Sequence, residues 1–201
     1  PRIGVLREQI GGAIDKAQQH VLNQLALRLR ADGAEIVGAD VPAELFDAAR
    51  HASILVAVEA ALVHGELVDR SPDLVSAPIK ALVEEGRALP ATGYAKAKAL
   101  QVQMALRFDR WLTEEAGLDA LLVAPASGEA PRGLDYTGDA AFCAPWTFLG
   151  VPAVTLPVNF GPAGLPLGVQ LVGAGQHDAA LLSLAEWVEG RTGWNIAVAS
   201  R

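Results

Sequence analysis

The chain has 201 residues and a mass of 21.0 kDa, which is the size of one globular domain. With 51% hydrophobic and 19% charged residues it is too apolar to be disordered throughout, and its formal net charge of -7 argues against binding nucleic acid phosphates or an anionic membrane. The longest apolar run, Ala52–Val63, is interrupted by Glu59 and is shorter than the about 20 residues that span a bilayer. A single cysteine, Cys143, excludes an internal disulfide and a multi-cysteine metal site, and it suits a reducing, cytoplasmic location. We therefore expect one domain over residues 1–201, with a small molecule or a protein as its partner.

The first 42 residues have the pattern of a βαβ unit. An apolar run at Ile3–Leu6 predicts a strand, and apolar residues at helical spacing over Ala17–Leu29 predict an amphipathic helix. Gly33 fits the position just past that helix, and Glu35–Val37 predicts a second strand. Such a unit favours parallel pairing of its two strands.

Helices dominate the middle of the chain. An Ala-rich pattern predicts a helix over Ala43–His64 that stops at Gly65, with His64 favourably placed as a cation at its carboxyl end. A shorter helix is expected over Ile79–Glu85 and a long one from about Gly93 to Ala116. These helices should pack on one another and on a sheet.

The last third of the chain returns to strands. The apolar run Asp119–Ala124 predicts a buried central strand, and it is followed by a loop over Pro125–Gly138 that is longer than structural connections usually are. Val151–Val158 and Leu167–Val172 predict two strands joined by a hairpin-like turn, and Asp178–Glu189 predicts a closing helix. Together these elements predict an α/β fold with a mixed, largely parallel sheet covered by helices.

The residues by themselves show no catalytic machinery. Ser127 is not part of a G-x-S-x-G motif, because Pro125 stands two positions before it, and no lysine follows a serine by three. The histidines are scattered, without metal-ligand spacing. Cys143 could pair with a histidine as a cysteine hydrolase, although a lone cysteine beside Phe142 is more typical of a small buried side chain. Ser127 follows the buried strand, where α/β folds place ligand crevices, and there it is more typical of a pocket wall than of a nucleophile.

Four segments of the second half carry a family resemblance. They are Ala120–Pro125 (ALLVAP), Phe142–Pro157 (FCAPWTFLGVPAVTLP), Gly164–Gly173 (GLPLGVQLVG) and Asp178–Ala185 (DAALLSLA). With the opening PRIGVL, the helix after it and the long helix from Tyr94, they resemble the amidase signature family in motif and in order. The resemblance covers essentially the whole chain, but only the later half of a typical member.

The resemblance implies hydrolysis of a small carboxylic amide, or transfer of its ammonia, through an acyl-enzyme and without metal or organic cofactor. Family members use a serine nucleophile, a second serine and a lysine base on segments that precede the region present here. This chain has no Gly-Gly-Ser-Ser-like run and no matching lysine. We therefore expect no catalytic residue in the chain, no activity of the chain alone, and an amidase-like fold that is incomplete.

The later half of such enzymes contributes part of the acyl-binding pocket. We place Tyr94, Ser127, Phe142, Cys143 and Trp146 there as substrate-binding residues. Their aromatic and small apolar character favours an apolar acyl or aryl group. A place in the structural core fits Phe142 and Trp146 equally well.

The beginning of the chain bears on its partners. It starts at Pro1 without an initiator Met and enters a strand at once, which favours a cut from a longer chain. We expect an amide substrate and the upstream half of the same enzyme as partners. We also expect self-association, because a cut sheet exposes strand edges and apolar surface. The alternative is a non-catalytic α/β module that binds a small carboxylate or a protein.

Overall fold

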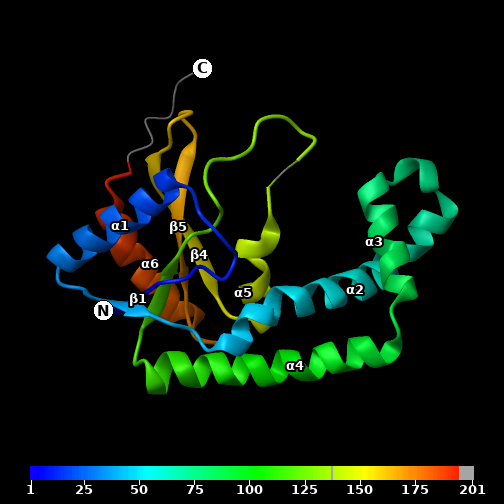
Figure 1. The fold of residues 1–201 in the computed structure, drawn as a ribbon, viewed down its shortest axis with the longest axis horizontal. Coiled ribbons are helices and arrows are strands. Elements are labelled where there is room, and N and C mark those ends of the chain that lie inside the picture. Colours follow the sequence, from blue (N-terminus) through cyan, green and yellow to red (C-terminus); the bar gives the residue numbers. More distant parts are fainter. Residues whose placement is uncertain (137, 195–201) are drawn as a thin grey trace.

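Five strands form one mixed sheet in this computed structural model, which describes residues 1–136 and 138–194. The strands are β1 (Arg2–Leu6), β2 (Glu35–Ala39), β3 (Ala120–Val123), β4 (Ala153–Phe160) and β5 (Pro166–Val172). Their order across the sheet is β2-β1-β3-β5-β4 (Figure 1). β1 pairs in parallel with both β2 and β3, whereas β5 is antiparallel to β3 and to β4. All strands except β5 therefore run in one direction, which confirms the predicted mixed, largely parallel sheet.

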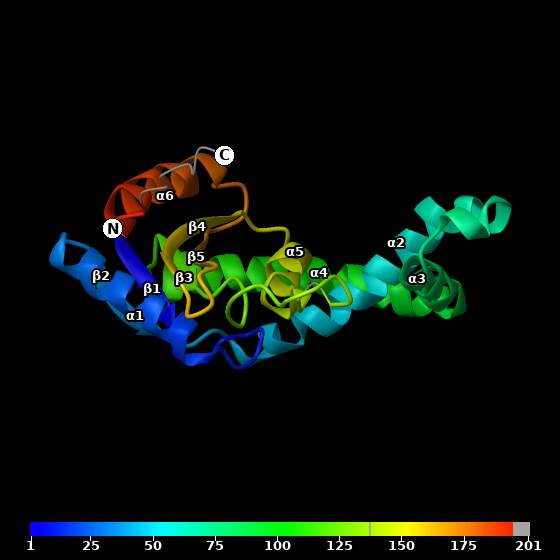
Figure 2. The same cartoon turned by 90° about the horizontal axis from the view of Figure 1, so that it is seen from above.

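Helices cover both faces of the sheet (Figures 1 and 2). They are α1 (Lys16–Ala31), α2 (Ala48–Arg70), α3 (Ala77–Ala88), α4 (Ala91–Arg110), α5 (Ala144–Leu149) and α6 (Asp178–Thr192). α1 and α6 pack on one face, and α2, α4 and α5 pack on the other. The predicted βαβ unit is confirmed as β1, α1 and β2, and the predicted long helix is α4 followed by a π-helical segment, Trp111–Glu115.

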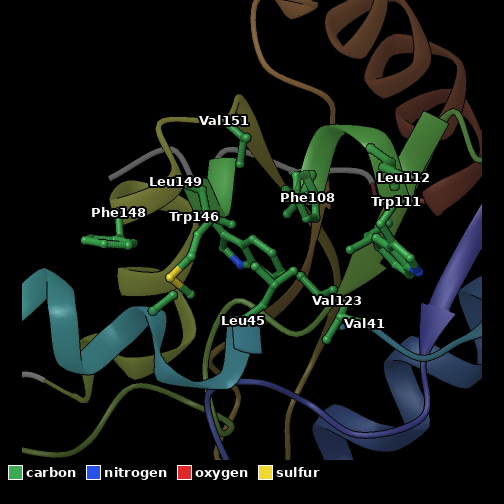
Figure 3. Packing of buried hydrophobic residues seen from close by; sticks show 14 of the residues in the cluster. Val41, Leu45, Phe108, Trp111, Leu112, Val123, Trp146, Phe148, Leu149 and Val151 are labelled. Atoms are coloured by element: carbon green, nitrogen blue, oxygen red, sulfur yellow. The ribbon is translucent and has the colours of Figure 1, made fainter. Parts of the chain in front are cut away.

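Alternation along the strands divides the core into two layers. On β3, Leu122 faces the layer formed with α1 and α6, whereas Leu121 and Val123 face the layer formed with α2, α4 and α5. The second layer is rich in aromatic side chains: the Phe108 ring lies 5.9 Å from that of Trp146 between ring centroids (Figure 3). All four residues of β3 are buried, as the apolar run predicts for a central strand.

α2 continues past the predicted stop. His64 and Gly65 lie inside the helix, so the expected ending at Gly65 and the capping place of His64 are wrong. α3 packs against this part of α2, and the Gly65 carbonyl accepts a hydrogen bond from Arg87 of α3 at 3.2 Å. The Arg87 guanidinium also binds Asp69 at 2.7 Å and holds the pKa of that carboxyl below its usual value. Gly65 therefore lies at a contact between α2 and α3. The pattern of neighbouring residues in the sequence does not reveal this contact.

α3 and the adjoining end of α2 extend away from the sheet (Figures 1 and 2). The helical segment Ala43–Arg70 is long and apolar enough, by length and composition alone, to cross a membrane, so the expectation that the apolar stretch around Ala52–Val63 is too short does not hold for the whole helix. Core helices of soluble proteins meet the same criterion. This property is therefore weak evidence for a membrane.

Candidate functional site

A cavity of about 680 Å³ lies where β3 ends, between the segment that follows β3 and the β4–β5 hairpin. Its wall consists of Gln18, Pro125–Pro131, Tyr136, Gly138–Ala140, Thr155, Pro157 and Pro166–Gly168. Ligands of α/β folds bind at the carboxyl ends of strands, and this cavity lies at the carboxyl end of β3. The long loop singled out from the sequence thus forms one of its walls.

Glu129 fixes that loop to the hairpin. Its carboxylate oxygens accept hydrogen bonds from the backbone N–H of Ala163 at 3.0 and 3.1 Å and from that of Leu165 at 2.8 Å. Gly161 lies so close that an added Cβ would stand 2.3 Å from the Glu129 carboxyl carbon. Hydrogen bonds to a carboxylate are about twice as strong as those between neutral groups, so Glu129 holds this part of the loop against the hairpin.

α1 holds the cavity from the other side. Asp15 caps α1 by accepting a hydrogen bond from the Gln18 N–H, and its own backbone N–H donates to the Ser127 carbonyl at 2.7 Å. The buried Gln18 side chain donates to the Gly168 carbonyl at 2.8 Å. The helix, the loop and the hairpin are therefore joined by polar contacts around the cavity.

A polar pair that the sequence analysis missed lies in the sheet beside the cavity. Thr155 of β4 and Gln170 of β5 stand directly opposite each other, and their neighbours Leu156 and Val169 point to the layer under α1 and α6. Thr155 lines the cavity, and Gln170 is only 6% exposed. Gln170 Nε2 lies 3.4 Å from Thr155 Oγ1, and Gln170 Oε1 is buried without a hydrogen-bond partner in the described part of the chain. Strand alternation is the signal that could have marked both side chains.

The five residues predicted to bind substrate do not gather in one place. Ser127 is exposed and lines the cavity. Cys143 is exposed as well, and its Sγ lies 3.7 Å from the Pro125 carbonyl oxygen, so the interpretation of this cysteine as a small buried side chain is wrong. Cys143 directly precedes α5, and its side chain lies beside Pro125 just after the end of β3, rather than inside either core layer.

The three aromatic residues lie elsewhere. Phe142 and Trp146 are buried, at 4% and 3% exposure, and the Trp146 ring belongs to the layer that contains Phe108 (Figure 3). Tyr94 is half-buried on α4, and its hydroxyl donates to Glu59 of α2 at 3.2 Å. Partial burial and that hydrogen bond raise the pKa of the Tyr94 hydroxyl. The structure therefore places Ser127 at the cavity and Cys143 near it. The Phe142 ring packs beside Gly11, whereas Trp146 and Tyr94 belong to the packing of the helices.

No activated nucleophile is assembled by the residues at 1–136 and 138–194. In that part of the chain no serine or cysteine side chain hydrogen-bonds to a lysine or histidine, and no group of three or more His, Cys, Asp or Glu side chains is placed to hold a metal ion. Ser53 and Ser183 donate to carbonyls of their own helices. These contacts give no serine or cysteine a base in hydrogen-bond reach.

Comparison with known proteins gives the family. The family model described as Amidase matches residues 1–182. A glutamyl-tRNA(Gln) amidotransferase chain of Trichormus variabilis is 25% identical over 223 residues, which cover 98% of this chain and 46% of that protein. The 6-aminohexanoate-cyclic-dimer hydrolase of Pseudomonas sp. is 30% identical over 107 residues, which cover 44% of this chain and 21% of the hydrolase.

Solved structures agree with the sequence relatives. A crystal structure of an amidase superimposes with a TM-score of 0.83 and 28% identity, covering 95% of this chain and 45% of the amidase. The structure of 6-aminohexanoate cyclic dimer hydrolase complexed with substrate gives a TM-score of 0.74 at 25% identity, with 96% and 45% coverage. The chain thus spans about half the length of the relatives that it matches throughout. The family model, the sequence relatives and the shared fold together place this chain in the amidase signature family.

Proposed function

We propose that this chain is the later part of an amidase that hydrolyses the C–N bond of a small carboxylic amide. The observation that supports it is the coverage: 95% of this chain matches a structure called an amidase, yet only 45% of that structure is matched. The chain then supplies strands, the two core layers and a cavity wall. A preceding segment supplies the serine pair and the lysine that the family resemblance implies.

The contacts support a division of the enzyme into a segment that carries the catalytic residues and this chain, which helps to bind the substrate. In the proposed reaction a serine hydroxyl attacks the amide carbonyl, the amine leaves with a proton, and water releases the acid from the acyl-serine. The described part of this chain holds no serine with a base in reach. We therefore propose that the chain is inactive alone and that its cavity helps to hold the substrate.

A serine-directed fluorophosphonate probe tests this division. The chain alone should remain unlabelled, whereas the product of the coding DNA extended upstream of Pro1 should be labelled and should hydrolyse members of an amide panel. Ser183→Ala in the extended protein should leave the labelling unchanged, because the Ser183 hydroxyl donates to the Ala179 carbonyl of its own helix and lies outside the cavity wall. Stoichiometric serine labelling of the chain alone, or a stop codon directly upstream of Pro1, would contradict the proposal.

A further inference from the structure

We propose that the cavity at the end of β3 binds an uncharged amide in preference to a carboxylate, with the Thr155 hydroxyl as its anchor and Gln170 as the positioning residue. The amide ligand class rests on the proposed function. The residues proposed to bind the amide are all in this chain, so binding can be measured without hydrolysis.

Gln170 is poorly explained by packing. On its face of the sheet, the neighbouring positions Val123 and Val172 are buried apolar side chains of the layer under α2, α4 and α5. A buried acceptor without a partner destabilises the folded state, and Gln170 Oε1 is such an acceptor in the described part of the chain. An apolar side chain would serve stability better at this position. Buried polar groups that work against stability are typical of functional sites.

The pair gives Thr155 a defined hydrogen-bonding direction. Gln170 Nε2 is a donor only, so at the 3.4 Å contact Thr155 Oγ1 is the acceptor. The hydroxyl hydrogen of Thr155 then remains available, and Thr155 is exposed in the cavity wall. A hydroxyl donor held in this way matches a carbonyl oxygen, the acceptor that every carboxylic amide carries.

The charges of the wall select against an anion. Glu129 and Asp139 line the cavity, and none of its described lining residues is Lys, Arg or His. Backbone N–H groups hold both carboxylates in place: those of Ala163 and Leu165 bind Glu129, and that of Ala141 binds Asp139 at 2.9 Å. A carboxylate ligand would meet two like charges with no cation beside it, whereas a neutral amide would not. A volume of about 680 Å³ also suits a small organic ligand.

Two ligands of equal length test the preference. The chain is titrated with hexanamide and with hexanoate by calorimetry or ligand-observed NMR. Hexanamide should bind, and hexanoate should bind at least about tenfold more weakly because of the acidic wall. This comparison needs no variant, so it stands even if a substitution impairs folding.

Thr155→Val tests the anchor. It should weaken hexanamide binding about three- to tenfold, the value of one neutral hydrogen bond, and Thr155→Ser should restore it. Thr113→Val is the matched control, because among the described residues the exposed Thr113 hydroxyl bonds only the Asp109 carbonyl, and Thr113 lies outside the cavity wall. That control should leave hexanamide binding unchanged.

Gln170→Met distinguishes a positioning role of Gln170 in amide binding from a merely structural role. It should weaken hexanamide binding while the melting temperature stays equal or rises, because it removes the unpaired buried acceptor. A merely structural role would lower the melting temperature and leave binding by the folded protein unchanged.

Three results would overturn the inference: no hexanamide binding, hexanoate binding as tight as hexanamide binding, or unaltered binding in Thr155→Val. None of them depends on the fluorophosphonate test. Binding without labelling of the extended protein would contradict the proposed function alone, and labelling without binding by this cavity would contradict the inference alone.

Discussion

Gly86 shows how a single position can decide a helix packing. It lies on α3 where α3 crosses α2, and a Cβ added there would stand 1.9 Å from the Ala57 carbonyl oxygen. Gly86→Ala must therefore separate the two helices. We expect a loss of about 1–3 kcal/mol in the free energy of unfolding, measured by urea denaturation.

Gly190→Ala is the matched control for that measurement. Gly190 lies inside α6, and an added Cβ there meets no atom within 4 Å among the described residues outside the local backbone of its own helix. The substitution should stabilise the chain by about 0.5–1 kcal/mol through helix propensity. Equal effects at Gly86 and Gly190 would show that the contact with Ala57 does not limit the packing.

At the level of elements, the loop after β3 and the β4–β5 hairpin are joined through Glu129. Glu129→Gln keeps the size of the side chain but removes its charge and one acceptor oxygen. We expect a loss of about 1–2 kcal/mol in unfolding free energy, together with faster hydrogen exchange at the N–H groups of Ala163 and Leu165.

Glu114→Gln serves as the control for the charge change. Glu114 is exposed in the π-helical segment after α4, and it forms no ion pair with any residue that the structure describes. Hydrogen exchange at Ala163 and Leu165 should not respond to it. If exchange at these two amides stayed slow in Glu129→Gln, the loop would be held by other contacts.

For the whole molecule, the open sheet and the apolar surface favour self-association. β2 and β4 are the two outer strands of the described sheet, and Leu62, Leu74 and Leu134 are 83%, 84% and 93% exposed. Exposed edges and apolar patches promote association at micromolar concentrations. We therefore expect light scattering at about 50 μM to give a mass above that of one chain.

Leu62→Asp distinguishes the two surfaces that could associate. If the measured mass falls, the apolar surface of α2 contributes to association, and if it does not, the strand edges account for it. A monodisperse monomer of the unaltered chain would contradict the prediction. The extended protein should associate less, because its additional residues would cover part of this surface.

Most of the sheet could be predicted because its signals are local. The buried run of β3, the apolar segments of β1 and β5 and the turn between β4 and β5 depend on neighbouring residues only. Two of the family motifs, Ala120–Pro125 and Gly164–Gly173, include β3 and β5, so the fold class and the family followed in part from the same residues. The end of α2 could not be predicted, because Gly65 has its role in the contact with Arg87, twenty-two residues further along the chain.

The candidate site divides in the same way. The family, the order of the elements and the place of Ser127 at the end of a buried strand could all be inferred from the amino-acid sequence. The exposure of Cys143, the place of Trp146 in the core and the meeting of Thr155 and Gln170 beside a cavity became visible in the folded chain alone. The physical reason is that periodicity reports which face a side chain shares with its own neighbours, whereas burial and partnership depend on segments that only folding brings together.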